Sequence, residues 1–198
     1  MYGMVNRAIK EYVENHCDGI AWNDVKEQAN LQVEEFQSME QYEDAVSVDL
    51  IVALSEIQGI SPAKVLEHIG EFWIDFAYRS EYGSLIDMAG TTLPEILMQL
   101  DELHERVGES FEHLKPPSFW CTNVSDNSLT LHYVSEREGL APMVIGLIKG
   151  LGKHLSLTCE VTHTAQRSEG ANHDEFAVTY TNRVDVGEPQ DEPLEASA

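Results

Sequence analysis

The chain has 198 residues, 42% of them hydrophobic, which is enough for one full-sized core and favours one domain over two. Its formal charge of −23 would repel a nucleic-acid backbone or an anionic membrane surface, so neither is expected as a partner. No apolar run approaches the roughly 18 residues that span a bilayer, and Arg7 and Lys10 interrupt the region where a signal peptide needs an apolar core, so we expect a cytoplasmic protein.

The first half of the chain has the apolar spacing of helices. We expect helices over 2–16 and 22–29, a third around Met39 and Tyr42, and an apolar segment over 48–57 that ends at Gly59. Ser61-Pro62 is a strong helix start, because it combines a capping residue with proline at the first helical position. An aromatic-rich stripe that includes Trp73 follows it, and such a stripe usually belongs to a core.

The stretch 92–107 predicts a helix with one histidine on its apolar face. Thr92 and Glu95 have the spacing of a capping box, and Gly108 follows the last apolar residue. His104 lies within the apolar stripe, where each ring nitrogen needs a partner or loses hydrogen bonds worth roughly 1–3 kcal/mol. From spacing alone, His104 is either a core histidine bonded to a neighbour or a metal ligand.

Strand signals follow Lys115-Pro116-Pro117, which cannot continue a helix. Candidate strands cover 119–124, 129–137, 155–164 and 175–181, and a glycine-containing helix is expected over 142–154. The stretch 183–198 is acidic and nearly free of bulky apolar groups, so we expect a disordered tail after one domain over 1–182. The pattern predicts an α+β fold, with a helical N-terminal part and a C-terminal antiparallel sheet bearing one inserted helix.

Three polar residues continue the core-facing row of the second candidate strand. Tyr133, Ser135 and Arg137 point the same way as Leu129 and Leu131 in a strand. An inward arginine needs an anion, and a guanidinium with two hydroxyls nearby suits a carboxylate or a phosphate. The alternative is that the strand leaves the core by residue 133 and the three residues are solvated. An inward histidine and an inward anion clamp together fit a ligand that carries both a metal and acid groups.

Other metal and enzyme signals are weak. Cys159 and His163 would lie about 13 Å apart along a strand, too far to share an ion, and His173 completes no motif with them. The three cysteines have no CxxC spacing, which argues against a disulfide framework and a structural zinc finger. Neither a nucleophile elbow nor a phosphate-binding loop is present, so we expect no enzyme.

Five stretches together resemble the H-NOX domain, the haem nitric oxide/oxygen binding module also found at the N-terminus of the soluble guanylate cyclase β subunit. They are MYGMVNRAI, LDELHERVG, LKPPSF, the Y-x-S-x-R pattern at 133–137, and GLAPMVIGLIKGLG, and the resemblance covers about residues 1–182. The resemblance implies that His104 ligates the haem iron, that Tyr133, Ser135 and Arg137 hold the haem propionates, and that Pro117 presses on the macrocycle. Because no CxxCH sequence is present, the haem is expected to be a non-covalent b-type haem.

The resemblance also implies a gas sensor. Met143 matches the position at which O₂-binding members carry a tyrosine, and Val5 and Trp73 are expected as its pocket neighbours. NO and CO are therefore the expected ligands, with release of His104 from the iron as the signal. The partner is expected to be a separate protein, typically a histidine kinase or a cyclase. The alternative function is a haem-free acidic regulatory or protein-interaction module.

Overall fold

The computed structural model describes residues 1–111 and 113–182, so the expected tail over 183–198 lies outside the described residues. Seven helices come first: α1 (Gly3–His16), α2 (Trp22–Gln28), α3 (Asp44–Gln58), α4 (Pro62–Tyr78), α5 (Gly83–Ala89), α6 (Leu93–Met98) and α7 (Leu100–Gly108). The second half contains β1 (Ser118–Thr122), β2 (Ser128–Val134), α8 (Ala141–His154), β3 (Leu157–Ala165), a short 3₁₀ helix η1 (Arg167–Glu169) and β4 (Asp174–Asn182). The predicted α+β class, with one helix inserted between strands, is confirmed.

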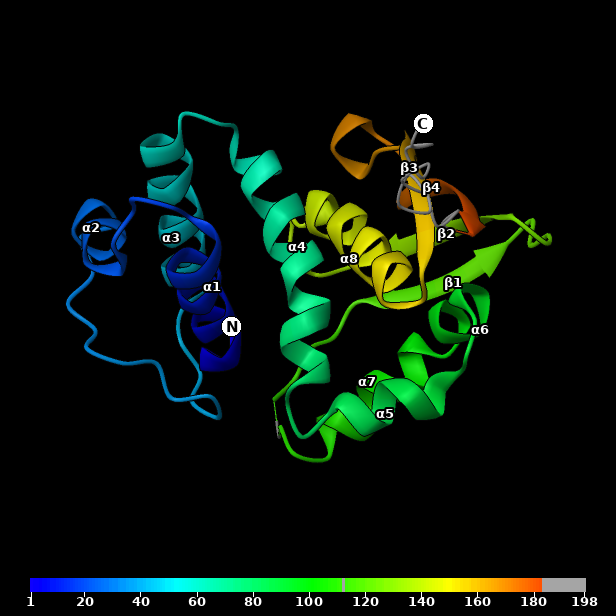
Figure 1. The fold of residues 1–198 in the computed structure, drawn as a ribbon, viewed down its shortest axis with the longest axis horizontal. Helices are drawn as coiled ribbons and strands as arrows, with labels where there is room; N and C mark the ends of the chain where they lie inside the picture. Colours follow the sequence, from blue (N-terminus) through cyan, green and yellow to red (C-terminus); the bar gives the residue numbers. More distant parts are fainter. Residues whose placement is uncertain (112, 183–198) are drawn as a thin grey trace, which may run out of the picture.

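The four strands form one antiparallel sheet in the order β1-β2-β4-β3. Leu131 of β2 lies opposite Phe176 of β4, and both side chains are completely buried. Alternation along the strands therefore turns one face towards α8, whose Val144, Ile148 and Leu151 belong to the same apolar cluster. Figure 1 shows α8 between this sheet and α4.

The apolar core has two parts. One cluster joins α1, α2, α3 and the N-terminal part of α4, and the other joins the sheet with α6 and α8. Helices α4 and α8 lie side by side between the two clusters (Figure 1), and Met143 of α8 contacts the first while Ile74 of α4 contacts the second. This α4–α8 seam connects the two halves of the molecule.

Two of the expected helices differ from those observed. The expected helix around Met39 and Tyr42 is wrong: these residues lie in turns, and α3 begins only at Asp44. The backbone N–H of Tyr42 donates to the carbonyl of Met1 at 2.8 Å, and Tyr2 bridges to Gln41, so this segment pairs with the N-terminus instead of coiling.

The single helix expected over 92–107 is also wrong in one respect, because it divides at Gln99. The N–H of Gln99 donates to the carbonyls of both Glu95 and Ile96, which tightens the turn and ends α6. The predicted capping box at Thr92 and Glu95 is present and starts α6. On the two sides of the break burial differs: α6 buries Leu93, Ile96 and Leu97, whereas α7 has no fully buried residue.

The structure contains no single helix, within its described residues, that is both long and apolar enough to cross a membrane. Helices α3 and α4 meet the same test only as a pair, and a bend of 108° separates them.

Candidate functional site

One apolar cavity brings together all of the residues that the sequence singles out. It has a volume of about 240 Å³ and opens between α1, α4, α7, α8 and the end of β2. Its walls include the eight predicted site residues, which come from six separate segments of the chain: Val5, Trp73, His104, Pro117, Tyr133, Ser135, Arg137 and Met143.

A second apolar compartment of about 190 Å³ adjoins the first. Both compartments share Met4, Trp73, His104, Pro117 and Leu147 among their walls. His104 therefore lies where the two compartments meet. The space on either side of the imidazole is lined mainly by carbon, which suits a flat and largely apolar ligand.

His104 is the chemically unusual residue of this cavity. Its Nδ1 atom is buried and has no hydrogen-bond partner among residues 1–111 and 113–182. Burial lowers the pKa of His104, and the nearby carboxylate of Asp101 only partly opposes this effect. The imidazole is therefore held neutral, which is the form that binds a metal ion.

The first turn of α7 is fixed to the sheet through Asp101. Its Oδ2 accepts a hydrogen bond from the Ser118 hydroxyl at 2.7 Å, and its Oδ1 accepts one from the Phe119 backbone N–H at 2.8 Å. The Phe119 ring lies 5.9 Å from that of His104. Further along α7, Arg106 forms an ion pair with Glu102 of the same helix, and both side chains are exposed. The start of α7 is thus anchored more firmly than its end.

The second predicted group stands at the end of β2. Tyr133 and Ser135 are both buried, as the period-two pattern predicts, although the strand ends at Val134. Arg137 lies beyond the strand, so the alternation does not place it. Its Nε donates to Asp44 Oδ2 at 2.8 Å, and its Nη1 donates to the Lys115 carbonyl at 3.0 Å.

Asp44 is the partner of Arg137 that sequence reasoning missed. Partial burial disfavours the charged carboxylate, but the N-terminal ammonium and the Arg137 guanidinium outweigh it and lower the pKa of Asp44. Asp44 therefore stays ionised and holds the guanidinium at the cavity rim. Nothing in the sequence indicates this pairing, because the two residues are 93 positions apart.

These residues fit a haem. The neutral imidazole of His104 lines the cavity, the walls are apolar, and a guanidinium lies with two hydroxyl-bearing residues on the same cavity. Those three features match an iron, a macrocycle and acid groups, respectively. Pro117 lines both compartments beside His104, where it would contact the macrocycle.

The expected gas pocket is apolar apart from one indole. Val5 of α1, Trp73 of α4 and Met143 of α8 come together on the cavity wall. The methionine thioether has no hydrogen to donate, whereas the Trp73 indole N–H does. The Trp73 ring also packs against Phe76, with centroids 5.7 Å apart.

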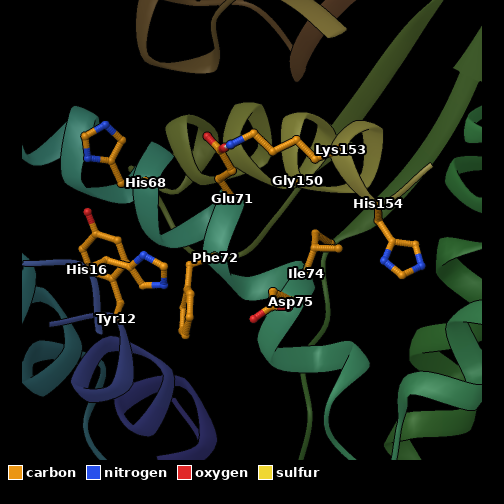
Figure 2. A pocket seen from close by; sticks show the side chains of 10 residues that line it. All are labelled: Tyr12, His16, His68, Glu71, Phe72, Ile74, Asp75, Gly150, Lys153 and His154. Atoms are coloured by element: carbon orange, nitrogen blue, oxygen red, sulfur yellow. The ribbon is translucent and has the colours of Figure 1, made fainter. Parts of the chain in front are cut away.

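A larger cavity, of about 600 Å³, lies between α1, α4 and α8 and contains none of the predicted site residues. Figure 2 shows Lys153 reaching towards Glu71, with which it forms an ion pair, and His154 pointing away on the other side. The walls of this larger cavity are polar to a large extent, and the cavity is open to solvent. This cavity therefore lacks the enclosed apolar walls that a haem needs.

Comparison with known proteins gives the family. Residues 2–163 match the Haem-NO-binding family model. The chain is 32% identical over 158 residues to soluble guanylate cyclase gcy-31 of Caenorhabditis elegans, covering 80% of this chain and 22% of that protein. It is 28% identical over 153 residues to gcy-33 of the same organism, covering 77% of this chain and 16% of that protein. The chain thus spans only about a fifth of the length of these two relatives.

Solved structures agree on the fold. The structure is similar to an H-NOX protein from S. oneidensis in its Fe(II)NO state, with a TM-score of 0.80 and 18% identity, over 92% of this chain and all of that one. An unliganded Fe(II) H-NOX protein from K. algicida gives a TM-score of 0.79 and 19% identity over 93% and 98% of the two chains. The matched region is a sensor domain and not a catalytic one. The chain therefore belongs to the Haem-NO-binding (H-NOX) family of haem-based gas sensors.

Proposed function

We propose that this chain senses NO, and binds CO, at a ferrous b-type haem held without a covalent bond, with His104 as the protein ligand to the iron. The observation that carries the proposal is the imidazole of His104, which burial keeps neutral and which lines an otherwise apolar cavity. Its buried Nδ1 has no hydrogen-bond partner among the described residues. A bound haem would supply the iron at which a diatomic gas binds. The cytoplasmic location expected from the sequence is part of the same proposal.

Tyr133, Ser135 and Arg137 would hold the two propionates. Arg137 uses its Nε and Nη1 for Asp44 and Lys115, which leaves Nη2 to donate to a carboxylate. The buried hydroxyl-bearing side chains of Tyr133 and Ser135 lie on the same wall. Asp44 holds the guanidinium in place for this contact, so the clamp is positioned before the haem enters.

Val5, Trp73 and Met143 would shape the gas site. Bound O₂ carries partial negative charge and is stabilised by a hydrogen-bond donor, while NO and CO bind without one. Of these three side chains, only Trp73 carries a donor, its indole N–H. We expect the ferrous protein to bind NO and CO and to form no stable oxy complex in air.

Signalling would use the uneven attachment of α7. Asp101 fixes the first turn to β1, whereas His104 stands beyond that anchor and would be tethered by the iron. If NO binding to a bound haem freed His104 from the iron, the end of α7 could move about its fixed start. One ligand would thereby bias two arrangements of the helix, which a separate partner such as a histidine kinase or a cyclase can distinguish.

The assignment of His104 is tested by His104→Gly. The variant should lose the histidine-like absorption spectrum of the ferrous protein and retain less haem, and added imidazole should restore the spectrum by filling the space. His113→Gly is the matched control, because His113 lines the same cavity yet is exposed. Unchanged haem content and spectrum in His104→Gly would refute the proposal, as would equal losses in both variants.

A further inference from the structure

Three metal-binding side chains meet on the sheet face that points away from α8. His132 of β2 and Glu175 of β4 are register partners, and their side chains alternate with the buried Leu131 and Phe176. His173 precedes Glu175 by two residues, so it reaches the same face. All three therefore lie on the opposite side of the sheet from the haem cavity.

The ligand atoms of this triad are close together. The Nδ1 of His132 lies 2.9 Å from the Nε2 of His173 and 3.5 Å from Oε1 of Glu175, and the last two atoms are 3.2 Å apart. Zinc ligands at about 2.0–2.2 Å in tetrahedral positions lie roughly 3.3–3.6 Å from one another. Two of the three separations need little change, and the nitrogen pair needs to widen by a few tenths of an ångström.

We propose that His132, His173 and Glu175 form a binding site for a divalent transition-metal ion, with Zn²⁺ as the ion that suits it best. Two imidazoles and one carboxylate are a ligand set that binds Zn²⁺ in proteins and leaves a fourth position for water. The site is separate from the haem in both residues and position. The protein would thus carry two metal sites, one on each side of the sheet.

The surroundings of His132 support metal binding through Nδ1. Its other nitrogen, Nε2, lies 2.7 Å from the hydroxyl of Thr122. That contact lets the Nε2–H donate to Thr122, which leaves the Nδ1 lone pair for a metal. The Trp120 indole stacks on the His132 ring, with centroids 4.9 Å apart and planes 3° apart, and this fixes the orientation of the imidazole.

A competing explanation is a hydrogen-bonded network without metal. A proton on one imidazole nitrogen would satisfy the 2.9 Å contact between His132 and His173, and Glu175 would then accept from either ring. The two explanations differ in stoichiometry and in ligand chemistry. A metal site takes up one ion per chain through nitrogen and oxygen atoms alone, whereas the network takes up none.

The experiment uses the haem-loaded full chain, stripped of adventitious metal with a chelator and titrated calorimetrically with Zn²⁺. We expect one site per chain, and X-ray absorption at the zinc edge should show nitrogen and oxygen ligands without the sulfur signal near about 2.3 Å that cysteine would give. The haem absorption band and circular dichroism report the fold of every sample, and iron and zinc are counted separately.

His173→Ala and Glu175→Gln each remove one ligand and should weaken Zn²⁺ binding at least about tenfold. His163→Ala is the matched control, because His163 also contacts a carboxylate, at 2.8 Å from Asp174, but lies on the other face of the sheet. Its Zn²⁺ affinity should equal that of the parent, and the haem spectrum should be unchanged in His173→Ala and Glu175→Gln.

Four outcomes would overturn the proposal. These are no stoichiometric Zn²⁺ uptake by the folded parent, equal uptake by the parent and His173→Ala, equal weakening by His163→Ala, and a sulfur-ligated zinc. None of these outcomes bears on the haem assignment, since the triad shares no residue with that cavity.

Discussion

The two helical walls of the proposed haem cavity are built in opposite ways. At the α4–α8 seam, Gly70, Gly146 and Gly150 let the two backbones touch, and a Cβ atom at Gly146 would stand 2.7 Å from the Glu71 nitrogen and nearer still to the Glu67 carbonyl. The Lys149 ammonium adds a 2.6 Å ion pair to Glu67 across the same seam. On α7, all of whose residues the structure describes, no side chain is fully buried.

This difference identifies the part that we expect to stay fixed and the part that we expect to move. Close-packed backbones change little because any displacement creates overlap or voids. A helix that buries no side chain fully, and is fixed mainly at its first turn, costs less to reorient. The seam can therefore serve as a fixed frame against which displacement of α7 is measured, and a sensor needs both elements.

The largest expected effect is a loss of stability when the close packing of the α4–α8 seam is disrupted. Gly146→Ala should lower the free energy of unfolding by about 3 kcal/mol, the upper end for overpacking, because the new methyl group meets backbone atoms that cannot rotate away. Urea unfolding of the haem-loaded protein measures this change. A loss below about 0.5 kcal/mol would mean that the helices separate easily and that the seam is no fixed frame.

The second prediction concerns the proposed propionate-binding residues at the end of β2. Arg137→Ala should weaken haem retention by about 2 kcal/mol, or roughly thirtyfold, since a charged hydrogen-bond partner is lost and Asp44 keeps its charge. Tyr133→Phe removes one hydroxyl and should cost about 1 kcal/mol or less. The rate at which each variant loses haem is measured by transfer of the haem to an acceptor protein. Equal retention by both variants and the parent would show that this end is no clamp.

The sequence predicts some residues of the candidate site and of the α4–α8 seam, but not others. His104, Tyr133 and Ser135 are identified by periodicity, because burial repeats with the geometry of a helix or a strand. The predicted alternation extends to Arg137 as well, but β2 ends at Val134, so the strand geometry does not determine where this side chain lies. The resemblance to the family indicates its place independently. The contact of Gly146 with α4 has a sequence signal, closely spaced glycines, but the pattern does not name the partner helix.

The two helices that the sequence predicts wrongly also depend on contacts between distant parts of the chain. The residues around Met39 and Tyr42 have some helical spacing, yet a backbone pairing with the N-terminus, about 40 positions away, takes precedence. The break at Gln99 follows from what α6 and α7 each contact, which no local pattern contains. His132, His173 and Glu175 were likewise missed as a group, since only the strand register brings them together.

The third prediction compares the two walls directly, by hydrogen exchange of the ferrous protein with CO and with NO. We expect amides in 104–108 to exchange about tenfold faster with NO, equivalent to about 1.4 kcal/mol, because the proposed mechanism frees His104 with NO and leaves it attached with CO. The seam helix α8 (141–154) is the internal control and should exchange equally in both complexes. Identical protection of α7 in the two states, or a six-coordinate NO spectrum under all conditions, would contradict release.

The smallest expected effect is that of Gly108→Ala. It is again a glycine-to-alanine change, but it should raise the free energy of unfolding, whereas Gly146→Ala should lower it. Gly108 is the last residue of α7, its φ lies outside the left-handed region, and a Cβ atom there would meet nothing within 4 Å. Gly108→Ala should therefore raise the free energy of unfolding by about 0.5–1 kcal/mol, because alanine loses less backbone entropy than glycine on entering a helix. Urea unfolding with an unchanged denaturant slope would confirm it. A loss of stability like that of Gly146→Ala would show that the end of α7 is packed as closely as the seam, and α7 would then lack the freedom that the release of His104 requires.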